Sequence, residues 1–141
     1  MRLSWLVITI AAAAILVAAG CSGSRVAADA ATPEVALMLQ TGMADGRMVY
    51  VGVGGAIDGQ INPELEVESG SRVRITVTNG DVMAHDLAVP AFGAKTPIIS
   101  AHGSKAEISF LVKEGQEGTY DYFCTIAGHR QAGMEGLLIV R

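Results

Sequence analysis

The stretch that most constrains this chain is the connection of residues 120–136, YDYFCTIAGHRQAGMEG, which joins two apolar runs. It carries a thiol, an imidazole and a thioether in Cys124, His129 and Met134, with four residues in each gap. Three such side chains on one short loop form an incomplete set of metal ligands. A soft thiolate, imidazoles and a weakly held thioether suit copper in an electron-transfer site. The loop therefore predicts a copper site between two strands, and one ligand is still missing.

The position of His85 makes it the candidate for the missing ligand. This residue lies just after a strand-like run, in the segment NGDVMAHDLAVP, well upstream of the loop. Together with Cys124 and His129 it would complete a trigonal plane of ligands, with Met134 at the end of a long axial bond. The remaining histidine, His102, is flanked by small polar residues and is predicted to be an ordinary surface residue.

The cysteine count agrees with a metal ligand at position 124. The chain has two cysteines, and Cys21 falls in an N-terminal segment that has the features of an export signal. Cys124 would then lack an intramolecular disulfide partner in an oxidising compartment. Ligation to copper gives a reason for such a lone thiol, and the alternative is a buried, inert cysteine.

Both segments resemble those of the cupredoxins, the type 1 or blue copper proteins. The resemblance covers residues 50–141, and the ligand spacing is closer to the rusticyanin, sulfocyanin and auracyanin type than to plastocyanins, whose loop is shorter. It implies one type 1 copper per chain, held by the four residues His85, Cys124, His129 and Met134. It also implies that the protein shuttles single electrons between redox partners, such as a c-type cytochrome or a copper enzyme.

The rest of the sequence predicts an all-β fold. In residues 72–78, Val73, Ile75 and Val77 alternate with polar residues, which is typical of a strand with one buried and one wet face. Further strands are expected at residues 47–53, 65–68, 86–89, 105–112, 118–124 and 136–140, whereas residues 34–40 fit a short helix or a first strand. The run GVGGAIDG suggests a bend or bulge. Short strands separated by Gly, Pro and Asn turns predict a Greek-key β-sandwich.

Residues 1–20 have the pattern of an export signal, with an early positive charge, a long apolar stretch and small residues at its end. A cysteine directly after Ala-Ala-Gly resembles the bacterial lipoprotein signal, which implies that Cys21 is lipidated and becomes the first mature residue. Residues 21–33 would then form a flexible tether, and residues 34–141 the cupredoxin domain. An uncleaved membrane anchor and a plain cleaved signal remain open. All three alternatives place the domain outside the cytoplasm, on the periplasmic or extracellular face.

Charge and motifs argue against several other classes of function. The formal net charge is -4, and no basic cluster exists that would grip phosphates, so no nucleic-acid partner is expected. The Gly-rich run lacks the Lys-Ser/Thr ending of a phosphate-binding loop. No small-molecule substrate is therefore expected.

The resemblance also implies roles for residues around the ligands. The C-terminal histidine of the family usually reaches the surface through an apolar patch, and a partner would dock here on Pro90, Phe92, Ala127, Arg130 and Ala132. Arg130 would select an acidic partner. Asp86 follows the ligand His85 where many cupredoxins carry Asn or Ser, and an ionised carboxylate beside the metal would favour copper(II). Backbone amides are expected to donate to the Cys124 sulfur, and a partner is expected to orient one nitrogen of each histidine.

Two rival functions use the same segments. A copper enzyme such as nitrite reductase or a multicopper oxidase contains similar domains, but its catalytic copper needs several more histidines, and only His102 is left over. The chain is therefore predicted not to be an enzyme. A periplasmic copper carrier, which holds the metal for delivery without redox cycling, is the remaining alternative.

Overall fold

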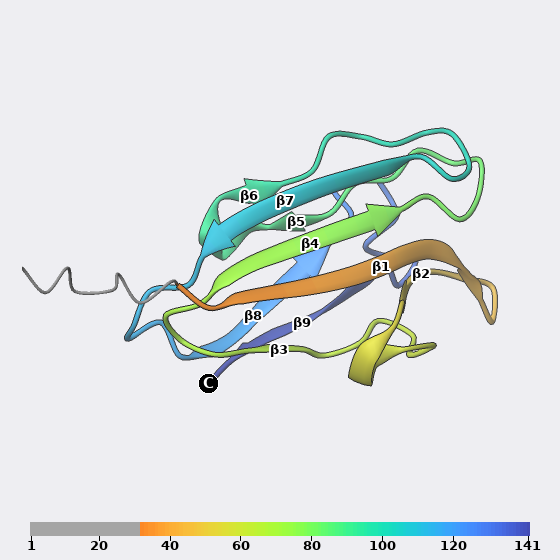
Figure 1. Cartoon of the computed structure of the whole chain (residues 1–141). Coiled ribbons are helices and arrows are strands. Elements are labelled where there is room, and N and C mark those ends of the chain that lie inside the picture. Colours follow the sequence, from red (N-terminus) through yellow and green to blue (C-terminus); the bar gives the residue numbers. More distant parts are fainter. Residues whose placement is uncertain (1–31) are drawn as a thin grey trace, which may run out of the picture. The chain divides into compact units, whose positions relative to one another are not determined.

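The computed structural model describes residues 32–141, which form two packed β-sheets (Figure 1). The first sheet has the order β2-β1-β4-β7 and consists of β1 (Glu34–Ala44), β2 (Arg47–Gly52), β4 (Arg72–Thr78) and β7 (Lys105–Leu111). The second has the order β3-β9-β8-β5-β6 and consists of β3 (Leu65–Val67), β5 (Ala88–Val89), β6 (Ala94–Lys95), β8 (Gly118–Phe123) and β9 (Glu135–Val140). The predicted all-β sandwich is confirmed.

Strand β4 is the centre of the first sheet, and it has the predicted alternation of buried and wet positions. Val73, Ile75 and Val77 are each 0% exposed and face the second sheet. Strand β1 pairs with β4 in parallel, and β7 pairs with it in the antiparallel direction. These two neighbours satisfy the backbone groups of β4 on both sides, which fits a strand whose buried face lies at the middle of the core.

Strand β1 settles the alternative left open for residues 34–40, because the segment is a strand and continues to Ala44. Its hairpin to β2 turns at Asp45 and Gly46, which have φ values of 51° and 74°. Positive φ at both central residues is the geometry of a type I′ turn, for which Asp-Gly is a favoured pair. The Gly-rich run after β2 forms a short 3-10 helix, Gly55–Ile57, where a bend or bulge was expected.

The predicted strand at residues 86–89 was too long, since only Ala88–Val89 pairs as β5. The backbone of His85 instead exchanges hydrogen bonds with Ile99, at 2.9 and 2.8 Å, in an isolated bridge. The backbone amide of Leu87 donates to the Thr96 hydroxyl at 3.0 Å. The segment is held by these loop residues, which fixes His85 outside the regular sheet. A 3-10 helix, Pro90–Phe92, follows β5 directly.

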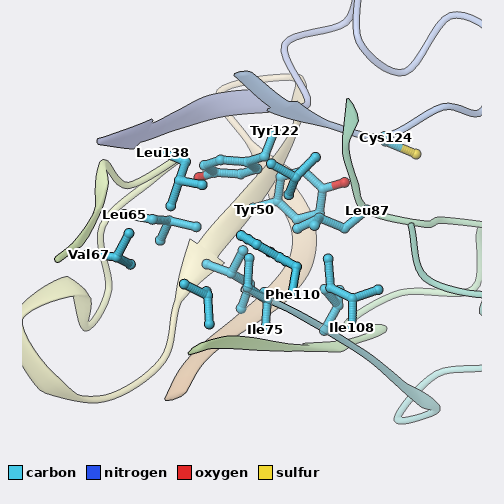
Figure 2. Close-up of a cluster of buried hydrophobic side chains, with 14 of the residues drawn as sticks. Tyr50, Leu65, Val67, Ile75, Leu87, Ile108, Phe110, Tyr122, Cys124 and Leu138 are labelled. Atoms are coloured by element: carbon cyan, nitrogen blue, oxygen red, sulfur yellow. The ribbon is translucent and has the colours of Figure 1, made fainter. Parts of the chain in front are cut away.

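Two fully buried tyrosines pack together in the core, and one of them reaches the segment after His85 (Figure 2). The rings of Tyr50 and Tyr122 lie 5.5 Å apart and are tilted by 57°. Aromatic pairs of this kind contribute about 0.5–1.5 kcal/mol beyond their buried area. The Tyr122 hydroxyl donates to the carbonyl of Pro63 at 2.8 Å, and the Tyr50 hydroxyl donates to the carbonyl of Asp86. Burial is the main reason that the pKa of both phenols is raised.

The predicted export signal, Cys21 and nearly all of the predicted tether lie outside the described residues. The predicted start of the domain at residue 34 coincides with the first residue of β1. Within residues 32–141, no helix is long and apolar enough to cross a membrane.

Candidate metal centre

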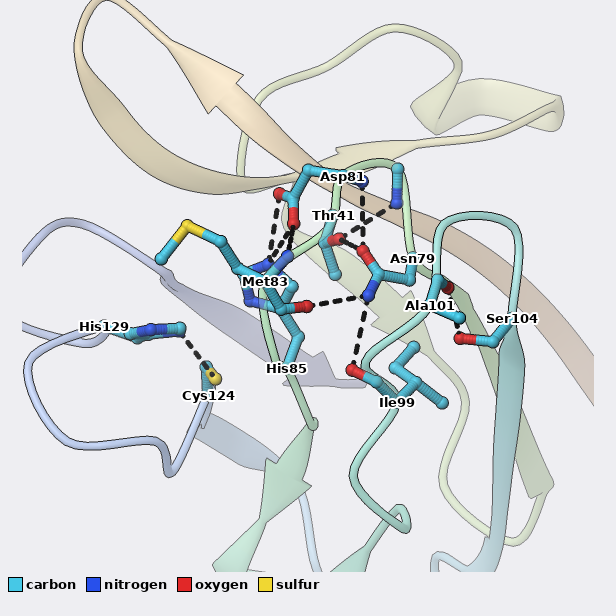
Figure 3. Close-up of polar contacts among 11 residues, drawn as sticks. Thr41, Asn79, Asp81, Met83, His85, Ile99, Ala101, Ser104, Cys124 and His129 are labelled. Atoms are coloured by element: carbon cyan, nitrogen blue, oxygen red, sulfur yellow. Dashed lines mark hydrogen bonds and ion pairs between the residues drawn. The ribbon is translucent and has the colours of Figure 1, made fainter.

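Three of the sequence-predicted ligands, His85, Cys124 and His129, come together at one end of the sandwich (Figure 3). One ligand atom from each lies within 4.8 Å of the other two, and all three residues are buried. The Cys124 sulfur is 3.5 Å from Nδ1 of His129, and the two imidazole rings lie 5.0 Å apart. The cluster therefore joins a segment that precedes β5 to the loop between β8 and β9.

The loop after β8 folds back on itself, which brings its ligands close to each other. The backbone amide of Cys124 donates to the carbonyl of Met134 at 3.1 Å, and the amide of Met134 donates to the carbonyl of His129 at 3.0 Å. Gly133 has a φ of 104°, a conformation that glycine adopts at no steric cost. The glycine before Met134 therefore permits the loop to turn back at this point. Met134 itself is 0% exposed.

His85 has one nitrogen bonded and one nitrogen free. Its Nε2 lies 2.9 and 3.1 Å from the two carboxylate oxygens of Asp81. Its Nδ1 is buried and has no hydrogen-bond partner. A buried polar atom without a partner is costly, and a bound metal ion would satisfy it. Together with a thiolate and a second imidazole, this nitrogen fits a type 1 copper site.

The surroundings shift the pKa values of two members of the cluster. Burial raises the pKa of the Cys124 thiol, while backbone amides of Asp86 and Ile126 that donate to its sulfur work against the rise. Burial, and next the neighbouring His85, lower the pKa of His129, which favours the neutral imidazole that a metal requires. A coordinated metal ion would deprotonate the thiol outright.

Asp86 connects the two segments that carry the ligands. One carboxylate oxygen accepts the Thr125 amide and the other accepts the Thr125 hydroxyl, both at 2.6 Å. The Lys95 ammonium lies 3.1 Å from the same carboxylate. Burial opposes ionisation of Asp86, but the Thr125 bonds and Lys95 outweigh it and hold the pKa below its ordinary value. A negative charge is thereby kept on the residue that follows His85, where it is bonded to the residue that follows Cys124.

The residues expected to dock a partner occupy different surroundings. Ala127 is exposed beside His129, and Ala132 is half-buried on the same loop. Pro90 is exposed and lines a shallow hollow with Arg130. Phe92 is half-buried instead, because its ring stacks on Phe110 at 4.9 Å and meets Tyr120 edge-on at 5.0 Å.

Arg130 has its charge balanced within the domain. Its guanidinium bonds to Glu135 at 2.7 Å and to Asp121 at 2.9 Å. The same group lies 4.0 Å from the centre of the Phe123 ring, a cation–π contact. Two carboxylates therefore compete with any acidic partner for this side chain.

Sequence reasoning missed Asp81, Lys95 and Thr125, the side chains that contact His85 and Asp86. It also missed the apolar surface of the neighbouring segment, where Val82 is 82% and Met83 39% exposed. The only available signal for Asp81 was its place in the Asn-Gly-Asp turn four residues before His85. His102 is exposed and lies outside the cluster.

A β-sandwich with a buried cluster of one thiol and two imidazoles defines a class, that of proteins with a mononuclear copper site. The sequence itself matches a profile of copper-binding proteins, the plastocyanin/azurin family, over residues 60–141. The chain belongs to this family, the cupredoxins, which bind one copper and generally transfer single electrons. A comparison with curated proteins found no significant match.

Solved structures show the same fold. Rusticyanin from Thiobacillus ferrooxidans matches with a TM-score of 0.58 and 22% identity, covering 77% of each chain. Auracyanin B matches with a TM-score of 0.55 and 18% identity, covering 77% of this chain and 88% of that one. The multicopper oxidase Fet3p, which functions in iron import, matches with a TM-score of 0.58 and 26% identity. The match covers 77% of this chain but only 23% of the Fet3p chain.

Proposed function

We propose that this protein is an exported, membrane-tethered carrier of single electrons, with one type 1 copper held by His85, Cys124, His129 and Met134. The observation that carries the proposal is the buried cluster of three ligand atoms, in which Nδ1 of His85 has no protein partner. Copper bound there supplies a one-electron couple. Met134 completes the set, since its backbone bonds to both loop ligands and its side chain is fully buried.

The protein's own residues hold the site rigid and dry. His85 and Met134 are 0% exposed and Cys124 is 1% exposed, so these residues are shielded from solvent. Rigid ligands reduce the rearrangement that accompanies a change of oxidation state. His129, at 7% exposed, is the ligand nearest to solvent, and its edge is the proposed exit for the electron.

The surface around His129 supports brief docking with a redox partner such as a c-type cytochrome or a copper enzyme. The exposed Ala127 and the half-buried Ala132 lie on the same loop as His129, and the exposed Pro90 lines a shallow hollow with the adjacent Arg130. Small interfaces of this kind are typical of transient electron-transfer pairs. Arg130 is assigned to the rim of this surface, where its two internal carboxylates moderate its charge.

An enzyme acting alone is disfavoured, because the sequence contains three histidines and the third, His102, is exposed and outside the cluster. A copper carrier is the second candidate, and it would use the same ligands for delivery. The experiment that separates the two mixes the copper-loaded domain first with reduced cytochrome c and then with a copper(I) chelator. An electron carrier is expected to oxidise one equivalent of cytochrome per copper, to do so again after each reoxidation with ferricyanide, and to keep its copper. Rapid loss of copper to the chelator without redox cycling would favour the carrier.

The membrane tether is a separate proposal, supported by the lipoprotein-like sequence before Cys21. The test is Cys21→Ala in the full chain, followed by membrane fractionation and labelling with a fatty-acid probe. The wild type should take up the label and sediment with membranes, whereas the variant should do neither. A variant that stays in the membrane fraction would favour an uncleaved anchor, and an unlabelled, soluble wild type would favour a plain cleaved signal.

A further inference from the structure

The side chain of Asp81 lies behind the metal centre, on the far side of the His85 ring from the Cys124 sulfur (Figure 3). Both of its oxygens are within 3.1 Å of Nε2 of His85, and no backbone carbonyl takes this place. The imidazole is 0% exposed, whereas the carboxylate is 22% exposed. His85 is therefore the buried member of a carboxylate–histidine pair at the edge of the domain.

Asp81 is itself held in place by a network of hydrogen bonds. Its Oδ1 accepts the backbone amide of Met83 at 2.7 Å, and its own amide donates to Oδ1 of Asn79 at 3.0 Å. Asn79 is fully buried, and the hydroxyl of Thr41 donates to its Oδ1 at 3.1 Å. The Asn79 amide nitrogen donates to the carbonyl of Met83 at 2.8 Å. The carboxylate thus has a fixed position that does not depend on a metal.

The chemistry of this pair determines where the imidazole proton lies. A carboxylate can only accept hydrogen bonds, so Nε2 of His85 must carry the proton. Nδ1 then keeps its lone pair, and this is the nitrogen without a protein partner. A negative charge behind a ligand histidine also makes the imidazole a stronger donor to a metal.

We propose that Asp81 is a positioning residue of the copper site, which fixes the tautomer and ring orientation of His85 and strengthens its bond to copper(II). The inference rests on the proposed copper site. A stronger donor stabilises copper(II) more than copper(I), so Asp81 lowers the reduction potential.

The test compares two substitutions that remove different properties. Asp81→Asn keeps an oxygen that can accept the Nε2 proton but removes the charge, and Asp81→Ala removes both. Asp45→Asn is the matched control, because it removes one charge from an exposed side chain in the β1–β2 turn. Asp81→Asn should bind copper(II) at least tenfold more weakly than the wild type. A tenfold loss confined to copper(II) corresponds to a rise of about 59 mV in a one-electron potential. The control should change neither value.

The tautomer of His85 is measured separately, in the copper-free protein, from the nitrogen-15 NMR signals of its ring. Wild type and Asp81→Asn should carry the proton on Nε2, and Asp81→Ala should show a mixture of both tautomers. An Asp81→Ala protein that keeps the single Nε2 tautomer would overturn the positioning role. Asp81→Asn with the affinity and potential of the control would overturn the electrostatic role.

Near-ultraviolet circular dichroism of the buried tyrosines shows that each variant is folded. Because the tautomer needs no copper, it also separates the two proposals. A wild-type protein with the expected tautomer and no copper binding would contradict the proposed function alone.

Discussion

Cys124 is buried at the end of β8, and its sulfur has two kinds of neighbour. Nδ1 of His129 lies 3.5 Å away, and the backbone groups of Asp86 and Ile126 work against the rise that burial causes in the pKa of the thiol. Burial alone would leave this residue as an inert thiol. With two imidazoles close by, its sulfur fits the ligand set of a soft cation such as copper.

Met134→Leu tests the fourth ligand. Leucine keeps the buried volume, so the loss of stability should stay below about 1.5 kcal/mol. Without the thioether, copper(II) loses a donor, and the reduction potential should rise because the axial ligand tunes it. Voltammetry and the visible spectrum of the copper protein measure the effect. Met48→Leu is the control, because Met48 packs against the core on β2. Identical potentials in the two variants would show that Met134 is core and not a ligand.

Asp86→Asn tests the charge beside the ligands. The amide oxygen can still accept the Thr125 amide, but the negative charge is lost, so copper(II) should be less favoured and the potential should rise. Lys95→Gln provides an opposite change, since it leaves the carboxylate without its ammonium neighbour. The potential of this second variant should fall. An unchanged or lower potential in Asp86→Asn would contradict the role of this carboxylate.

At the scale of elements, the β8–β9 pair determines where the ligand loop begins and ends. Phe123 lies opposite Glu135, and Cys124 and Met134 then continue the pairing with a backbone hydrogen bond of 3.1 Å. The loop is thus an extension of the hairpin. Its ligands keep their spacing as long as the two strands keep their register.

Gly136→Ala tests how closely β9 packs against β8 in this hairpin. A Cβ at position 136 would overlap the ring of Tyr122, which is fully buried and bonded to Pro63. Overpacking of this kind typically costs about 1–3 kcal/mol of the free energy of unfolding. Gly42→Ala on β1 is the control, since a Cβ there meets no atom within 4 Å, and its effect should stay within about 0.5 kcal/mol. Urea unfolding measures both. Equal midpoints for the two variants would contradict the packing described for Tyr122.

The elements also show how far the sequence could predict the site. Cys124, His129 and Met134 share one short loop, so local spacing was sufficient to group them, whereas His85 was nominated from its position near a distant strand. The helix or strand question for residues 34–40 stayed open because β1 pairs with β4, more than thirty positions along the chain. Asp81 was missed because an aspartate in an Asn-Gly-Asp turn already has a local explanation.

At the scale of the whole molecule, a metal bound at the cluster would join two connections that are far apart in the sequence, the segment before β5 and the β8–β9 loop. Copper binding should therefore stabilise the domain. With free copper at one hundred times its dissociation constant, the gain is about 2.7 kcal/mol. Thermal melts of loaded and copper-free protein, followed by circular dichroism, should show a higher midpoint for the loaded form. The same midpoint in both would mean that the folded state does not bind copper selectively.

The most direct test of a copper site built on Cys124 is a titration of the copper-free domain with copper(II), followed by visible absorption. An intense band from charge transfer between thiolate and copper should grow until one equivalent has been added, and it should be absent from Cys124→Ser. A wild-type protein without this band, or a band that survives in Cys124→Ser, would contradict the site.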